Sequence, residues 1–96
     1  MVKEPKTIDT LYSAIVSLES EADCRNFFED LCTIPELHSM AQRLEVARLL
    51  HAGKTFNEIM NEVGASSATI SRVNRSLVYG SGGYRSLLEK QNGERK

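Results

Sequence analysis

The sequence predicts an all-α protein, a small helical bundle that contains a helix-turn-helix. Apolar residues recur at three- and four-residue intervals in several segments, which is typical of helices with one buried face, and the signal for strands is poor. In the stretch NEIMNEVGASSATISRVNRSL, a glycine separates two short amphipathic runs. The 96 residues have the length of one small domain, which spans residues 1–96.

Three helices are expected in the first half of the chain. Apolar stripes at helical spacing run over residues 8–18 and 24–32, and acidic residues mark the start of the second helix. A third helix is expected over residues 35–52, ended by Gly53 and so apolar around its circumference that it should form the centre of the fold. The apolar surface of these three helices exceeds what a monomer of this size could bury. Residues 1–53 are therefore expected to be the core and dimerisation helices of an obligate dimer.

Two short helices with recognisable start and stop signals should follow. Thr55 and Glu58 match a capping box, in which each side chain bonds to the other residue's backbone amide at a helix start. Gly64 should end this helix in a left-handed conformation, and Ser66 or Ser67 should cap the next one. The first of the two helices carries four apolar residues, namely Phe56, Ile59, Met60 and Val63.

The remainder of the chain should complete the fold with one more helix. A glycine-rich run over residues 80–83 ends the preceding helix, so that the helix-turn-helix spans residues 54–79. The C-terminal helix is assigned to residues 80–91, and residues 92–96 are expected to be a frayed tail. Three apolar residues of this helix are expected to pack inward, namely Tyr84, Leu87 and Leu88.

The second helix of the pair has one side with the composition of a DNA-reading surface. Ile70 and Val73 lie on its inward side, whereas residues 64–88 contain no acidic residue, unlike an ordinary solvated helix face. Small residues allow close approach to a groove, hydroxyls can bond bases or phosphates, and arginines make bidentate contacts to guanine. A plain αα-hairpin within a bundle is the alternative. The candidate DNA-contacting residues are Thr55, Asn57, Ser66, Ser67, Ala68, Thr69, Ser71, Arg72 and Arg75.

The distribution of charge supports this interpretation more than the total does. The net charge of −1 argues weakly against a nucleic-acid-binding protein. However, residues 1–63 contain 6 Lys and Arg against 11 Asp and Glu, which gives −5, whereas residues 64–96 contain 6 against 2, which gives +4. A polyanion that docks on one face responds to the local field.

The segments GASSATISRVNRSL and TIPELHSMAQRLEVARLLHAGK resemble the recognition helix and the central helix of the tryptophan repressor. The resemblance covers roughly residues 32–88, and the segment VYGSGGY looks most like the small Trp-repressor-like proteins of the YerC/YecD type. It implies an all-helical, interlaced homodimer whose two recognition helices project outward onto a palindromic operator in double-stranded DNA.

The same resemblance bears on a ligand pocket. Thr33, Arg43 and Arg72 match the positions that grip tryptophan in the repressor, but Val73 stands where the repressor has a glycine that leaves space for the indole. We therefore expect no cofactor and no dependence on tryptophan. A smaller amino acid or another anion as co-effector remains the alternative. For Arg43, a structural ion pair with Glu45 or another carboxylate is the alternative to a ligand contact.

The sequence offers no catalytic site and no metal site. His38 and His51 are more than three helical turns apart, with no cysteines or paired carboxylates at metal-binding spacing around them, and Cys24 and Cys32 are expected to be core thiols. No apolar run reaches the length of a membrane span and no leader precedes the fold, so a cytoplasmic location is expected. We expect a DNA-binding transcriptional regulator rather than an enzyme, with a protein-interaction module for an acidic partner as the alternative.

Overall fold

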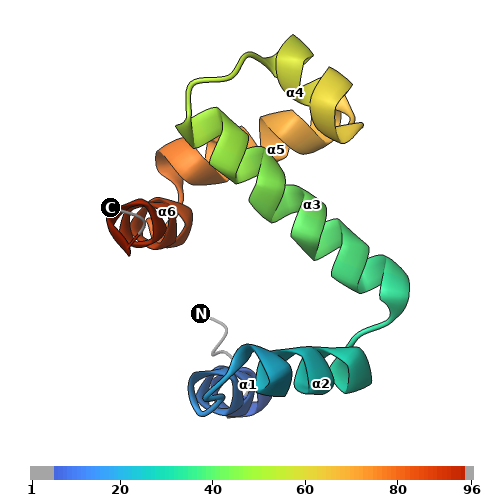
Figure 1. Cartoon of the computed structure of the whole chain (residues 1–96), viewed down its shortest axis with the longest axis vertical. Helices are drawn as coiled ribbons and strands as arrows, with labels where there is room; N and C mark the ends of the chain where they lie inside the picture. Colours follow the sequence, from blue (N-terminus) through green and yellow to red (C-terminus); the bar gives the residue numbers. More distant parts are fainter. Residues whose placement is uncertain (1–5, 95–96) are drawn as a thin grey trace. The chain divides into compact units, whose positions relative to one another are not determined.

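The computed structural model describes residues 6–94, and every regular element in this range is an α-helix (Figure 1). The all-α prediction is thus confirmed. The chain divides into two compact units, with the boundary between Leu37 and His38. The helices are α1 Lys6–Val16, α2 Glu21–Leu31, α3 Ile34–His51, α4 Phe56–Val63, α5 Ser67–Tyr79 and α6 Gly83–Glu94.

The first unit contains two helices that bury little within the single chain. The start of α2 is capped by Ser20, whose hydroxyl accepts a hydrogen bond from the amide of Asp23 at 3.0 Å. The rings of Phe27 and Phe28 meet edge to face, with centroids 5.5 Å apart. No residue of α1 or α2 is fully buried, and Tyr12 on the predicted α1 stripe is 59% exposed. The apolar stripes of both helices therefore remain open to a partner.

Helix α3 agrees with the predicted helix over residues 35–52 to within one residue at each end. At its start, the hydroxyl of Thr33 accepts from the amide of Glu36 at 3.2 Å, and the Glu36 carboxylate accepts from the amide of Thr33 at 2.8 Å. This is a capping box that satisfies two amide donors at the helix start. At the other end, Gly53 has a φ of 92°, which favours glycine.

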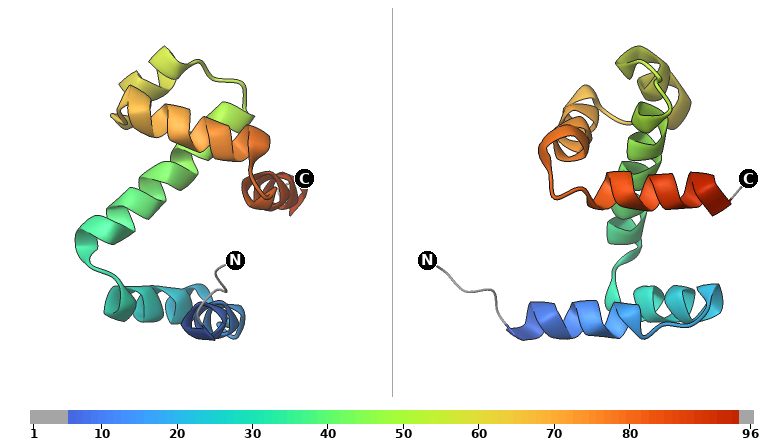
Figure 2. Two further views of the ribbon diagram at one scale, coloured as in Figure 1. Left: turned by 180° about the vertical axis from the view of Figure 1, so that it is seen from behind. Right: turned by 90° about the vertical axis from the view of Figure 1, so that its left-hand side faces the viewer.

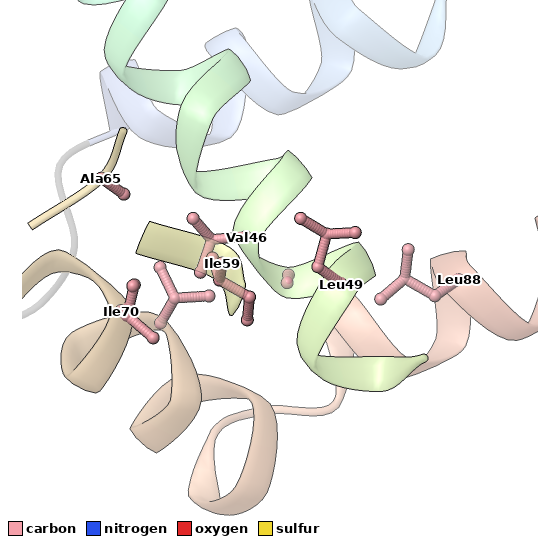
Figure 3. Packing of buried hydrophobic residues seen from close by; sticks show 8 residues of the cluster. Val46, Leu49, Ile59, Ala65, Ile70 and Leu88 are labelled. Atoms are coloured by element: carbon pink, nitrogen blue, oxygen red, sulfur yellow. The ribbon is translucent and has the colours of Figure 1, made fainter. Parts of the chain in front are cut away.

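The core of the second unit forms around the C-terminal half of α3. Figure 2 shows α4, α5 and α6 gathered about this part of α3, and in Figure 3 the labelled side chains from the four helices point toward a common interior. The fully buried members are Val46, Ala47, Leu49, Ile59, Ala65, Ile70, Val73 and Leu88. The prediction of a central third helix is therefore confirmed for its second half.

Three apolar side chains of the predicted helices are partly exposed, and one of them, Leu87, was predicted to pack inward. Phe56 and Met60 are each 38% exposed and Leu87 is 42% exposed. The reason is helical geometry, since neighbouring residues point about 100° apart. In α4 the buried Ile59 takes the inward direction, and in α6 the buried Leu88 takes it, so their neighbours lie at the margin.

The C-terminal helix has the predicted length but begins and ends three residues later than the predicted range of 80–91. Helix α6 begins at Gly83 and continues to Glu94, through Asn92, whereas the sequence indicated a frayed tail from residue 92 onward. A single glycine in a helix costs only about 1 kcal/mol, so Gly93 alone does not end the helix. Residues 95–96 lie outside the described part of the chain.

Candidate nucleic-acid interface

The turn between α4 and α5 is set by the signals that the sequence indicated. The hydroxyl of Thr55 accepts from the amide of Glu58 at 3.2 Å, and the Glu58 carboxylate accepts from the amide of Thr55 at 2.9 Å, which confirms the capping box. The bond from the Thr55 amide lowers the pKa of Glu58. Gly64 ends α4 with a φ of 78°, as predicted, and Ala65 is buried directly after it.

Helix α5 is capped by Ser66, not by Ser67. The Ser66 hydroxyl accepts from the amide of Thr69 at 3.1 Å and bonds to the Thr69 hydroxyl at 3.0 Å. Both hydroxyls are thus engaged with each other at the start of the helix, and Thr69 is half-buried. These bonds hold the start of α5 in place.

The free face of α5 has the composition that the sequence predicted. Ile70 is completely buried and Val73 is 1% exposed, which fixes the inward side of the helix. The opposite side spans about two helical turns, and two arginines three residues apart lie at its C-terminal end. Its exposed residues are Ser67, Ala68, Ser71, Arg72 and Arg75. This face can approach a groove closely and offers hydroxyl and guanidinium donors to it.

Helix α4 adds uncharged polar groups. Thr55 and Asn57, both predicted contacts, are exposed. Asn61, which was not among the predicted contacts, is also exposed and lies four residues after Asn57 on the same side of α4. The four-residue spacing of the two asparagines was the signal that could have identified it.

The four residues predicted for a ligand pocket occupy different settings. In the first unit, the Thr33 hydroxyl serves the capping box of α3, and the bond from the Thr33 amide lowers the pKa of Glu36. In the second unit, Arg43 is half-buried, Arg72 is exposed and Val73 is buried in the core. The burial of Val73 agrees with its predicted position on the inward side of the helix.

The ion pair considered between Arg43 and Glu45 is wrong. Glu45 instead pairs with Arg48, whose Nε donates to Oε1 of Glu45 at 2.9 Å. Residues two apart point to different sides of a helix, whereas residues three apart are neighbours. The pairing lowers the pKa of Glu45 and raises the pKa of Arg48, mainly through the hydrogen bond between them.

Other candidate chemistry finds no support in the described part of the chain. No cluster of three or more His, Cys, Asp or Glu side chains there could hold a metal ion. Cys24 and Cys32 are half-buried free thiols. Among the same residues, every helix is too short or too polar to cross a membrane.

Comparison with known proteins places this geometry in a family. Residues 6–92 match the family model described as Trp repressor protein. The chain belongs to the Trp repressor family. This confirms the resemblance inferred from the two sequence segments, and it covers both units of the chain.

Three members or relatives of the Trp repressor family illustrate the similarity. The chain is 52% identical over 85 residues to the uncharacterized protein YerC of Bacillus subtilis strain 168, covering 88% of this chain and 82% of YerC. It is also similar to the crystal structure of a TrpR-like protein from Eubacterium eligens, with a TM-score of 0.89, 45% identity, and coverage of 93% and 92%. A candidate Trp repressor from Staphylococcus aureus matches with a TM-score of 0.88, 45% identity, and coverage of 93% and 89%.

Proposed function

We propose that this protein is a sequence-specific, homodimeric DNA-binding regulator of transcription and not an enzyme. The observation that carries the proposal is the exposed face of α5, where Arg72 and Arg75 follow small and hydroxyl residues without a carboxylate in residues 64–88. Membership of the Trp repressor family supports the same function. In this proposal α5 is the recognition helix and enters the major groove.

The apolar stripes of α1 and α2, which contain no fully buried residue, support the homodimer. A two-fold dimer presents two copies of α5, so its operator should be a palindrome with half-sites about one helical turn apart. Arg72 and Arg75 would serve phosphates or guanine edges, and the exposed side chains of Asn57 and Asn61 would bond to the backbone or bases.

We further propose that the protein acts without tryptophan. Burial of Val73 to 1% exposure supports this, because its methyl groups are part of the packed core. Inserting an indole beside them would meet the penalty of overpacking. The core itself would then hold α5 at the angle that the groove requires, with no cofactor.

Selection of bound sequences from a random DNA pool tests the proposal. The wild-type protein should enrich a palindrome, and Arg72→Ala should weaken binding to it by about 1–3 kcal/mol. Arg25→Ala is the charge-matched control, since Arg25 lies on α2, is exposed and pairs with Glu21 within the same helix. Absence of any enriched sequence with a folded protein would contradict the proposal.

Salt dependence separates DNA binding from the alternative of an acidic protein partner. The logarithm of the binding constant for the selected DNA should fall linearly with the logarithm of the salt concentration, with a slope of about −0.9 for each phosphate neutralised.

The variant Thr69→Ala tests base recognition, and it should lose more binding free energy on the selected site than on scrambled DNA. Equal losses on both DNAs would assign Thr69 to backbone positioning, through its bond to Ser66, instead of base recognition.

A further inference from the structure

We propose that Arg85 is a positioning residue that fixes the C-terminal end of the recognition helix against α6. The inference rests on the proposed function of α5. Its basis is one contact between the two helices: Nη2 of Arg85 donates a hydrogen bond to the backbone carbonyl of Leu77 at 3.2 Å. Arg85 lies eight residues beyond Leu77, on the other side of the glycine-rich turn.

The end of α5 needs such a donor. The last four carbonyls of an α-helix have no partner within the helix, and the partial negative charge there favours a cation. Helix α5 has no basic residue of its own in its last turn. The amide of Gly80 bonds to the carbonyl of Ser76 at 2.9 Å, and Arg85 supplies a charged donor to the next carbonyl, that of Leu77.

The two ends of α5 are held in different ways. Its N-terminal half is fixed by the Ser66 cap and by the burial of Ile70 and Val73. Toward the C-terminus the packing decreases: Leu77 is only partly buried against the core, Val78 is 49% exposed and Tyr79 is 83% exposed. The direction of this end therefore depends on the packing of Leu77, on the turn into α6 and on the contact from Arg85.

Helix α6 can serve as a fixed support because it is anchored in the core. Leu88 is 2% exposed, and Tyr84 packs against the same cluster. The turn that precedes α6, visible in Figure 2, is also restricted. Gly82 has a φ of 88°, and a Cβ on Gly80 would lie 2.3 Å from the carbonyl oxygen of Ser76, so neither position accepts another residue without strain.

The consequence for DNA recognition is geometric. Arg75 lies two residues before Leu77, in the part of α5 that the contact from Arg85 supports. A shift of this end moves the Arg75 guanidinium relative to a base edge or a phosphate. Base contacts demand tighter geometry than backbone contacts, so binding to the selected operator should suffer more than binding to unrelated DNA.

The first experiment measures operator affinity over a series of salt concentrations for the wild type, Arg85→Ala, Arg85→Lys and the control Lys90→Ala. Lys90 is an exposed cation on the same helix. We expect Arg85→Ala to weaken binding roughly fivefold or more with an unchanged salt slope, and Arg85→Lys to restore most of the affinity. A slope reduced by about 0.9 per subunit would make Arg85 a phosphate contact and overturn the proposal.

A second measurement does not require DNA and so separates this inference from the proposed function. Hydrogen exchange of the Gly80 amide, which bonds to the Ser76 carbonyl, reports on fraying at the end of α5. We expect exchange to be roughly fivefold faster in Arg85→Ala than in the wild type and in Lys90→Ala. Unchanged exchange would overturn the positioning role, even if the protein binds DNA. If Arg85→Ala exchanges faster than the wild type but the wild type binds no DNA, the positioning role stands and only the proposed function is contradicted.

Discussion

At the scale of single residues, Val73 is the side chain that we propose takes the place of a ligand. It lies on the inward side of α5 beside Ile70 and is 1% exposed. Its removal in Val73→Gly deletes buried apolar volume and adds a glycine to a helix interior. We expect a loss of about 3 kcal/mol or more of unfolding free energy, measured by urea denaturation.

Val78→Gly is the matched control for this variant. Val78 is on the same helix but 49% exposed, so the substitution carries the same backbone cost with a smaller loss of packing. The difference between the two variants isolates the contribution of the core. Equal losses of unfolding free energy in the two variants would show that Val73 does not support the core. Val73→Gly should also lower the affinity for DNA in the absence of ligand.

Tryptophan should neither bind measurably nor improve DNA affinity. The physical reason is the volume that Val73 fills, next to which an indole would be overpacked. Isothermal titration calorimetry with tryptophan, followed by a panel of smaller amino acids, tests this expectation and the alternative of a smaller co-effector. Tight binding of tryptophan by the wild-type protein would refute the argument from occlusion.

At the scale of helices, the sequence was most informative where a signal is local. The Thr55–Glu58 capping box and the left-handed Gly64 could be predicted because each depends on residues within one turn. The capping box of Thr33 and Glu36 at the start of α3 is equally local, although it was not among the predicted signals.

Features that depend on distant residues could not be predicted in this way. The contact from Arg85 to Leu77 crosses a turn and needs the relative direction of two helices. The partial exposure of Phe56 and Leu87 depends on which residue of an apolar stripe points most directly at the core. Periodicity identifies the apolar side of a helix, but packing decides which of its members is buried.

The two capping boxes give stability a dependence on pH. Hydrogen bonds to the capping amides hold the pKa of Glu36 and of Glu58 below the ordinary value of 4.5 in the folded protein. A lowered folded pKa contributes stability that is fully present above the unfolded pKa and is lost as pH falls through the folded pKa. Stability should therefore decrease as pH is lowered from about 5 through the range below 4.5.

Urea denaturation over this pH range, comparing the wild type with Glu58→Gln, measures the effect. Glutamine keeps the shape of the cap but does not titrate, so the variant should be less stable at neutral pH and less sensitive to acid. Glu89→Gln is the control, because Glu89 is an exposed carboxylate on α6 and is not part of a capping box. An acid dependence that is the same in Glu58→Gln and in the wild type would exclude the cap as its source.

At the scale of the whole molecule, the two units differ in how they bury apolar surface. The second unit has a core of its own, built from α3, α4, α5 and α6. In the first unit, the stripes of α1 and α2 contain no fully buried residue. The periodicity of the sequence predicted the stripes, but periodicity within one helix does not identify the surface that covers them.

A second copy of the chain is the occupant that we predict for these stripes, and sedimentation at micromolar concentration should show a dimer. Leu11→Glu should dissociate or unfold it, since Leu11 lies on the half-buried side of α1 and a carboxylate cannot be buried there without a partner. Thr10→Glu is the control, because Thr10 is exposed on the same helix. Because interlaced interfaces resemble a protein core, separation of the subunits should coincide with loss of helix content. A wild-type protein that sediments as a folded monomer would contradict the dimer and, with it, the palindromic operator.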